Sequence, residues 1–438
     1  MTNQSFDRAT EFVVEKLEID GKPMDGSMFF ALEVFEHAFV SGITGRLTVV
    51  ETTSNQFLDE NKIEGNERIS IWISTPDDDS MRFEGYINKI SDRTVTANGV
   101  MTYNIEFVSP TIRENEQKRM TKRFKNVPPD DIASEVLQTL NKESEVEIKQ
   151  DKMMGGGNPM NFVCSRWKPI AVIQYVQKHG VPNERGGSTS DTGSSEQEIT
   201  GKGTGGFLFF ETMKGFRFGS GIEFLSGDLS DGDIKEFKQT LANQTSDIDE
   251  NRSHIMSFET IRNNDTQTQQ RGGAFRSQLV SMNMDTGEYK EQTWESDMAT
   301  DKQKLTSKAP TRVFARTLSN ERFNQECHRE TYNSVDQSLR TIQQEAGTIN
   351  NITDGMCRFT TPSRTDVSVG DKVDLSIYET SHESDQELDK KYSGKWIVSG
   401  VAHHFLRETN SAYSRITCLR STNQVDEGSA EKVDFKNK

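Results

Sequence analysis

The sequence predicts an α+β protein, mainly β, in which two small β-barrels flank a mixed α/β middle domain. Three observations lead to this fold class. Several short segments of alternating apolar residues lie within the first 110 positions, and apolar residues at helical spacing follow Pro110. Segments near the C-terminus repeat part of the pattern found in the first 110 residues. With 438 residues the chain is long for one hydrophobic core, so several domains are expected.

The first 110 residues contain several short segments that are typical of strands. Val13, Leu17 and Ile19 lead into a turn at residues 20–23, as expected for a strand followed by a hairpin. Residues 28–35, 69–74 and 103–107 show period-two alternation. Alternation buries one face of a strand and leaves the other wet or facing a partner, which favours a small barrel or sandwich.

Two helices are expected after Pro110. Apolar residues recur at helical spacing over 128–140, with Pro128 at the entrance, and over 169–178, with Gly180 as the stop. Residues 186–206 have almost no apolar side chains and predict a mobile loop.

The remaining segments mix strands with one long helix. FLFFET and FRFGS, separated by Met213, Lys214 and Gly215, predict a tight hairpin. Strands are expected near 275–282 and 288–294, and an apolar stripe predicts a helix over about 320–346. The charged residues 426–438 predict a frayed tail.

A weak internal repeat connects the two ends of the chain. Residues 65–72 resemble 370–377, each with a turn glycine, two polar residues and an alternating strand. Tyr86 precedes Tyr103 by 17 positions, and Trp396 precedes Tyr413 by the same interval. The second copy is longer by an acidic insertion, SHESDQELDKK, which a loop can absorb. The alternative interpretation is that any two β-hairpins look alike at this level; the equal spacing favours two related barrels.

These patterns predict the following domains. Residues 1–110 form the first β-barrel, and residues 206–230 with 356–424 form a second, discontinuous one. Residues 111–205 with 231–355 form the mixed α/β middle region and the long helix, and residues 425–438 a flexible tail.

Composition argues against several classes of protein. The formal net charge of −16 is opposite to that of a protein that holds nucleic-acid phosphates. It indicates either simple solubility or a surface that stays close to DNA without binding it. No run of about 18 apolar residues predicts a membrane-spanning helix, and the first residues lack the pattern of a signal peptide. The four scattered cysteines are expected to be reduced, mostly buried thiols of a protein assembled in a cytoplasm.

A search for chemistry yields no catalytic, cofactor-binding or metal-binding residues. Gly201-Lys202-Gly203-Thr204 lacks the spacing of a phosphate loop, and the neighbours His403 and His404 point to opposite faces of a strand. Cys164 is expected to be a structural thiol, with His179 too far along the next helix to activate it.

The carboxylates show no arrangement typical of a catalytic pair. No Asp or Glu lies in an obviously apolar pocket, and solvation of an edge strand is expected to explain Glu33 and Glu36. A glycosidase with paired carboxylates stays open, because such pairs need not be close in the sequence.

Several segments, in order, resemble the baseplate hub proteins of contractile-tailed bacteriophages, and more distantly the hub part of type VI secretion spike proteins. The segments that carry the resemblance are FEGYINKISDRTVTANGVMTYNIEFVSP, TKRFKNVPPDDIASEVLQTL, NFVCSRWKPIAVIQYV, GGFLFFETMKGFRFGS, GGAFRSQLVSMNMDTGEY, VSVGDKVDLSIYE and SGKWIVSGVAHHF. The sequence departs from the family in the loop at 186–206 and the acidic insertion near residue 385.

The resemblance implies a structural protein of the virion, without enzymatic activity or cofactor, assembled in the host cytoplasm. It implies a homotrimer with two tail-tube-like barrels per chain, so that six barrels match a hexameric tail tube and the threefold axis matches a trimeric central spike. Implied partners are the spike, the tube or its initiator, and baseplate wedge proteins, with DNA passing through the lumen without specific binding and no membrane insertion. An acidic lumen would favour that passage.

Two alternatives remain. One is the spike or hub component of a type VI-like or other contractile injection system, which is expected to carry a C-terminal β-helical needle that does not follow Leu419. The other is a tail-associated cell-wall glycosidase.

Overall fold

The computed structural model confirms an α+β fold that is mainly β. It describes residues 6–52, 56–76, 80–96, 99–142, 144–154, 156–157, 159–180, 182, 187–189, 196–201, 206–239, 247–262, 266–283, 287, 289–296, 312–318, 355–378 and 388–420.

The N-terminal series is a run of six strands that follow one another along the chain. They are β1 (Val13–Ile19), β3 (Phe29–His37), β4 (Thr44–Thr52), β5 (Arg68–Ser74), β6 (Met81–Val95) and β7 (Val100–Val108), with the short β2 (Lys22–Pro23) and α1 (Phe57–Asn61). The order in the sheet is β3-β4-β7-β6-β5-β1, and every neighbouring pair is antiparallel. The alternation predicted from sequence is confirmed, since Ile69, Ile71, Ile73, Tyr103, Ile105 and Phe107 are all buried in one core.

The C-terminal series has the same strand order. Its members are β15 (Lys235–Gln239), β17 (Ser257–Arg262), β21 (Gly355–Pro362), β22 (Lys372–Ser376), β23 (Gly394–Leu406) and β24 (Ser411–Arg420), with β16 (His254–Ile255) and α6 (Ile248–Arg252). They lie in the order β17-β21-β24-β23-β22-β15. Only the last pair differs in sense, because β15 runs parallel to β22 whereas β1 runs antiparallel to β5.

Backbone hydrogen bonds give the register of the repeat. The Asn66 N–H donates to the Ile87 carbonyl (2.8 Å), as the Gly370 N–H donates to the Val398 carbonyl (2.8 Å). Asn66 therefore matches Gly370, and both have a positive φ, 78° and 91°. The alignment expected from sequence, which matched Gly65 with Gly370, is wrong by one residue.

The corrected register also matches the cores. Ile69, Ile71 and Ile73 correspond to Val373, Leu375 and Ile377, and all six are buried. Tyr103 is buried, whereas Tyr413 lies half-buried on the opposite face of its strand, so these two tyrosines are not equivalent. The interval of 17 positions remains equal in the two series, because the corrected register moves both of its ends by one residue.

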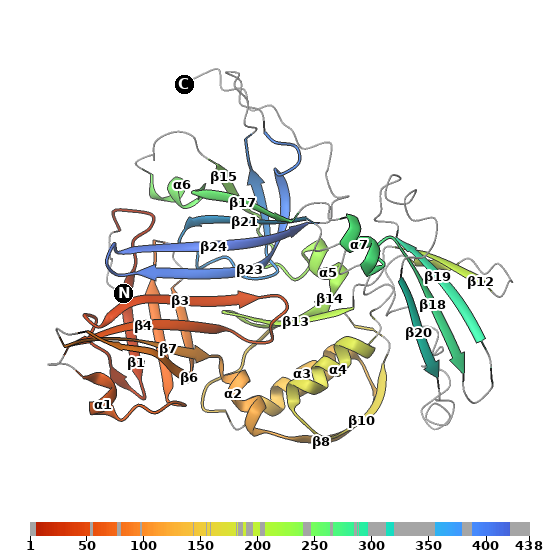
Figure 1. The fold of residues 1–438 in the computed structure, drawn as a ribbon, viewed down its shortest axis with the longest axis horizontal. Coiled ribbons are helices and arrows are strands. Elements are labelled where there is room, and N and C mark those ends of the chain that lie inside the picture. The colour runs from red at the N-terminus through yellow and green to blue at the C-terminus, as the bar shows by residue number, and fades with distance from the viewer. Residues whose placement is uncertain are drawn as a thin grey trace.

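The two series share one continuous sheet. β23 pairs antiparallel with β3 from Gly400–His37 to Leu406–Ala31, and the described strands close no barrel. Figure 1 shows β17, β21, β24, β23, β3, β4, β7 and β6 stacked in this order from top to bottom. The two separate barrels expected from sequence are thus not seen as closed bodies, since backbone hydrogen bonds join their edges.

The middle region places two helices between two small sheets (Figure 1). Its elements are α2 (Pro110–Gln117), β8 (Met120–Val127), α3 (Pro129–Asn141), β9 (Gln150–Met153), β10 (Met160–Trp167), α4 (Pro169–His179), β13 (Phe207–Thr212), β14 (Gly215–Ser220) and α5 (Gly221–Ser226). Both predicted helices and the predicted hairpin are confirmed. The α4 helix ends where its Gly180 cap donates an N–H to the Val176 carbonyl (2.7 Å).

The hairpin β13–β14 separates two cores. Phe209 and Phe216 pack with α3 and α4, whereas Phe210 packs into the core of the C-terminal series. The hairpin pairs with β9 and not with the strands of residues 356–424. β15 and β17, which were expected in the middle region, pair instead with strands of residues 356–424. The division into domains stays a prediction.

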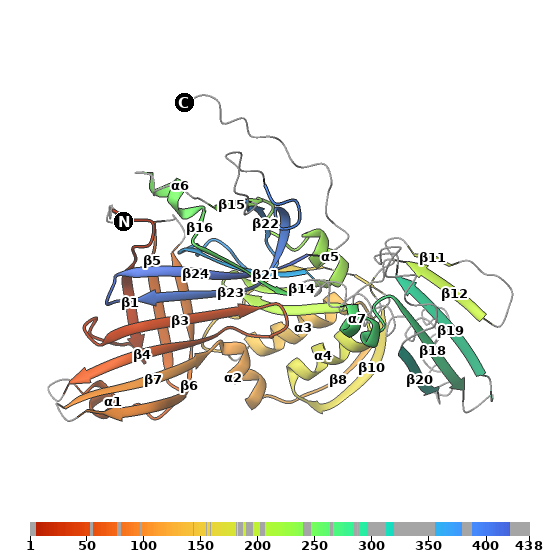
Figure 2. The ribbon, with the colours of Figure 1, turned by 45° about the horizontal axis from the view of Figure 1, so that its top comes forward.

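A further sheet lies at one end of the molecule, far from the N-terminal series (Figure 2). It contains β11 (Gly187–Thr189), β12 (Glu196–Gly201), β18 (Arg276–Asn283), β19 (Tyr289–Ser296) and β20 (Arg312–Leu318), and α7 (Thr266–Gly272) precedes β18. The strands expected near 275–282 and 288–294 are confirmed. The prediction of a loop over 186–206 is wrong for β11 and β12, because the polar β12 backbone pairs in parallel with β19. The expected helix at 320–346, the tail at 426–438 and residues 381–387 of the acidic insertion lie outside the described residues.

Candidate assembly surface

The joint between β23 and β3 holds the two series together. His404 lies opposite Glu33, and its Nδ1 is 3.1 Å from a carboxylate oxygen of Glu33. Phe35 packs edge-on against the His404 ring, with centroids 6.3 Å apart. These contacts add a polar and an aromatic interaction to the backbone ladder.

His403 and His404 point to opposite faces of β23, as predicted. His403 is buried beside Ser414 (Nδ1–Oγ 2.9 Å), and burial lowers its pKa to about 4, so its ring is neutral near pH 7. Among the described residues no group of His, Cys, Asp and Glu side chains is arranged to hold a metal ion.

A buried arginine ties the β13–β14 hairpin to the C-terminal series. The guanidinium of Arg217 contacts Asp151 (2.6 Å), Asp231 (2.8 Å) and Asp371 (3.0 Å), and it also donates to the Val369 carbonyl (2.9 Å). Lys235 of β15 contacts the other oxygen of Asp371 at 3.1 Å. Because Arg217 and Asp371 are almost fully buried, removing either one would leave the other with less compensating charge in the interior.

Two glutamates lie where β3 meets this hairpin. Glu36 accepts hydrogen bonds from the N–H groups of Met213 (2.9 Å) and Val369 (3.3 Å). The Glu211 carboxylate accepts one from the Ile43 N–H (3.2 Å). Burial raises the pKa of each carboxyl to about 7.

The expectation for Glu36 was therefore wrong. β3 is not an edge strand, since it has a strand on each side, and the Glu36 side chain lies on its buried face. The sequence contained a signal, since Leu32, Val34 and Glu36 share the inward parity of the strand.

The face of the sheet opposite the cores is polar. Its charged side chains include Glu33, Asp92, Glu106, Glu259, Arg46, Lys89, Arg358 and Arg415. Both signs are present, and Lys89 pairs with Glu106 (3.8 Å) and Arg358 with Glu259 (3.7 Å). A broad polar face of this kind is suited to contact with water or a hydrated partner and not to packing into a core.

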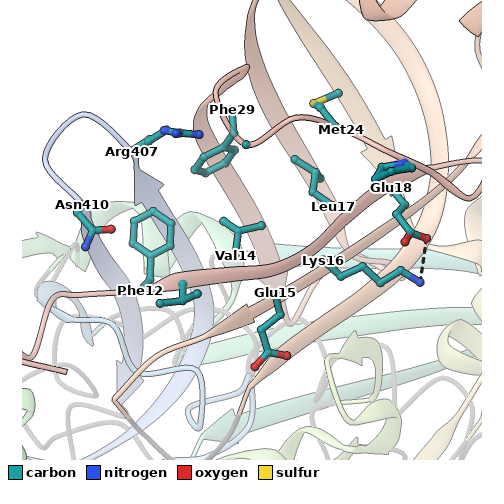
Figure 3. A pocket seen from close by; sticks show the side chains of 13 residues that line it. Phe12, Val14, Glu15, Lys16, Leu17, Glu18, Met24, Phe29, Arg407 and Asn410 are labelled. Carbon is teal, nitrogen blue, oxygen red and sulfur yellow. Dashed lines mark ion pairs between the residues drawn. The ribbon is translucent and has the colours of Figure 1, made fainter. Parts of the chain in front are cut away.

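An open groove of about 640 Å³ runs along β1 (Figure 3). Phe12, Leu17 and Phe29 form its apolar wall, and Lys16 is paired with Glu18 at 3.0 Å. Its described lining contains neither a cysteine nor a histidine. The lining is mixed, because Glu15, Lys16, Glu18 and Arg407 also border the groove.

The remaining candidate residues are placed as follows. Cys164 is buried, as expected, and its thiol donates to the Lys122 carbonyl (3.3 Å), while His179 stacks on Tyr175. Cys357 and Cys418 are buried opposite each other on β21 and β24. Gly201 ends β12, and 202–204 lie outside the described residues, as does Cys327. None of the helices in the described ranges is long and apolar enough to cross a membrane.

Comparison with known proteins finds relatives by structure alone. No family model matches the chain, and no curated protein matches its sequence. A prophage MuSo2 43 kDa tail protein from Shewanella oneidensis superposes with a TM-score of 0.54 at 10% identity, covering 94% of this chain and 99% of that one.

A tail protein from Neisseria meningitidis superposes with a TM-score of 0.55 at 8% identity, covering 95% and 98% of the two chains. A type VI secretion component from E. coli aligns at a TM-score of 0.45 and 8% identity, covering 93% and 77%, a likeness too weak to carry an argument. Over nearly its whole length, this chain has the fold of phage tail proteins.

Proposed function

We propose that the chain is a structural baseplate hub subunit of a contractile phage tail. Three copies form a ring that joins the hexameric tail tube to the trimeric central spike and lets the genome pass during injection. The observation that carries the proposal is the repeated strand order within one continuous sheet. The shared fold with phage tail proteins supports it.

The physical reason lies in symmetry. A closed ring needs equivalent surfaces at every step. A chain with two similar strand series presents two such surfaces, so three chains imitate sixfold geometry while keeping a threefold axis. The proposed partners follow: the tube or its initiator on one side, the trimeric spike on the other, and wedge proteins around the rim.

We also propose the division into tube-like barrels at 1–110 and at 206–230 with 356–424, a middle region at 111–205 with 231–355, and a tail at 425–438. The polar face of the sheet would line the lumen, since the other face packs on the cores. That lining would carry carboxylates and cations together, and repel DNA less than the acidic lumen first expected. The particle would be a virion component assembled in the host cytoplasm.

The test is the mass of the purified chain in solution at about 10 µM, a typical working concentration for specific interfaces. Sedimentation should give three times 49.5 kDa, which is 148.5 kDa, and electron microscopy should show rings. A monomer without ring-shaped particles would contradict the proposal.

The glycosidase alternative has one specific pair to test. Glu36 and Glu211 have raised pKa values, but Glu36 is buried and bonded to two backbone N–H groups. Cell-wall turnover by the purified chain that disappears in Glu36→Gln or Glu211→Gln would support the enzyme over the hub.

A further inference from the structure

Two buried cysteines face each other within the C-terminal series. Cys357 of β21 lies directly opposite Cys418 of β24, and both are fully buried thiols. They share the inward face of the sheet with the next inward pair, Phe359 and Ile416. Cys164, the other cysteine in the described residues, lies in a different core. Within the described part of the chain, this pair alone brings two thiols together.

The hydrogen bonds of the ladder set the spacing between the two cysteines. The Ser363 N–H donates to the carbonyl of Ala412 (3.1 Å), and these two residues continue the register of β21 and β24, which has no bulge. Hydrogen-bonded pairs recur at every second residue of such a ladder, so Cys357–Cys418 is one of them, with Cα atoms about 5.5 Å apart. Disulfides most often join Cα atoms about 5.5–6 Å apart. The two strands are therefore already placed for a disulfide.

The side chains of the pair are also in contact. The Cys418 thiol makes a side-chain hydrogen bond with Cys357, and this contact adds to burial in raising the pKa of the Cys418 thiol. Arg420, two residues further along β24, is close enough to Cys357 for an electrostatic interaction. A guanidinium beside a thiol favours the thiolate, which is the form that attacks a disulfide. Cys357 is thus placed to react first.

We propose that Cys357 and Cys418 form a redox site, with two thiols in a reducing cytoplasm and a cross-strand disulfide in an oxidising medium. Disulfides persist outside the reducing interior of a cell, where a virion component is released. The bond ties β21 to β24 and closes the long stretch of chain between them. The site does not depend on the proposed ring, because both cysteines belong to one chain.

The oxidant is a small soluble disulfide such as oxidised glutathione. The Cys357 thiolate attacks one sulfur of that disulfide, forms a mixed disulfide and releases one small thiolate. The Cys418 thiolate then attacks Sγ of Cys357, forms the Sγ–Sγ bond and releases the second small thiolate. The two protons of the cysteine thiols pass through solvent to these leaving groups. The chain is oxidised by two electrons, and the small disulfide is reduced to two thiols.

The reaction requires a local opening, because neither thiol is exposed. The strand next to β21 on its outer side is β17, which pairs with no other strand among the described residues (Figure 1). Thr260 of β17 lies opposite Cys357, so Cys357 is one strand away from the margin of the sheet. Proteins open locally at a lower free energy than they unfold globally. Oxidation should therefore be slow in water and faster in urea well below the unfolding transition.

The experiment uses the full chain with Cys327→Ser, which leaves three of the four cysteines. In excess oxidised glutathione, the titratable thiols should fall from three to one, and a non-reducing peptide map should link Cys357 to Cys418. The oxidised protein should melt about 5 °C higher, and dithiothreitol should reverse both changes. The same peptide map of the unmodified chain is a second measurement that needs no substitution.

Two matched variants in this background sharpen the test. Cys418→Ala should stop at the mixed disulfide and gain one glutathione group on Cys357. Cys164→Ala, in the other core, should still form the Cys357–Cys418 bond and keep no titratable thiol.

Three outcomes overturn the site. They are retention of all thiols in excess oxidant, a mixed disulfide that persists although Cys418 is present, and a bond that forms only once the chain is globally unfolded or that includes Cys164. A reversible Cys357–Cys418 bond formed below the transition supports it. None of these outcomes depends on the mass of the assembly, so failure of the site leaves the hub proposal standing.

Discussion

The N-terminal and C-terminal series reach the same strand order by different routes along the chain. The N-terminal series is contiguous from Val13 to Val108, whereas the C-terminal one takes β15 and β17 from residues 235–262 and the rest from 355–420. The same sheet order therefore does not require that the strands be contiguous in the chain. Long insertions between strands are compatible with this because loop-closure entropy rises slowly with length.

The two series differ most in the last strand of the sheet order, which is β1 in one and β15 in the other, and in the residues buried beside it. The turn before β5 has Glu67, half-buried, whose carboxylate accepts hydrogen bonds from the N–H groups of Glu64 (2.8 Å) and Gly65 (2.9 Å). The matching Asp371 accepts from the Ser368 N–H (3.1 Å) and is buried between Arg217 and Lys235. The same turn carboxylate is a local cap in one series and the centre of a charge network in the other.

The largest expected effect comes from neutralising these two carboxylates separately. Asp371→Asn should lower the free energy of unfolding by about 3 kcal/mol, because the buried cations Arg217 and Lys235 each lose one of their carboxylate partners. Glu67→Gln should cost about 0.5–1 kcal/mol, since water reaches that site. Urea denaturation of both variants measures the difference. Equal losses of unfolding free energy in the two variants would show that burying the charge network does not increase the contribution of the turn carboxylate to stability.

The next effect compares Glu36 of β3 with Glu211 of β13, the two glutamates whose pKa burial raises to about 7. Glu36 keeps its proton up to about pH 7 when folded and loses it near 4.5, its ordinary pKa, when unfolded. Stability should therefore fall as pH rises from 4.5 to 7, by at most about 1.4 kcal/mol per pH unit. Glu211 adds to the same window.

Glu36→Gln and Glu211→Gln should each remove one part of this dependence. Urea midpoints at pH 5 and pH 8 for the three proteins provide the measurement. A variant Glu36→Gln with the full pH slope of the unmodified chain would rule out a shifted Glu36.

The smallest effect concerns the matching turn residues Asn66 and Gly370. Asn66→Gly should change stability by less than about 1 kcal/mol, because glycine adopts the positive φ while the bond from Arg113 to the Asn66 side chain (2.7 Å) is lost. Gly370→Asn should cost about 1–2 kcal/mol, since its Cβ would lie 3.3 Å from Phe210 and 3.4 Å from Arg217. Thermal unfolding of both distinguishes them, and a Gly370→Asn variant as stable as the original would show that the second turn has spare room.

Local signals predicted much of this fold. Alternation placed Ile69, Ile71 and Ile73 inward, and the spacing of FLFFET and FRFGS gave the hairpin. The register of the repeat failed by one residue because the visible glycines mark different turn positions, with Asn66 adopting the conformation of Gly370.

Long-range pairings carried no comparable signal. The β23–β3 joint brings together residues more than 360 positions apart, and the sequence of β12, which pairs with β19, is polar. The Arg217 network was also missed, since its three aspartates come from separate segments.

The length of β23 has a consequence for how the chain comes apart. Because one unbroken strand completes the C-terminal series and also covers β3, melting that series would strip a neighbour from the other. Loss of one half should therefore affect the other. An N-terminal fragment without β23 would expose the unpaired edge of β3 from Ala31 to His37 and be prone to aggregation. Thermal denaturation of the two halves should accordingly be one cooperative event.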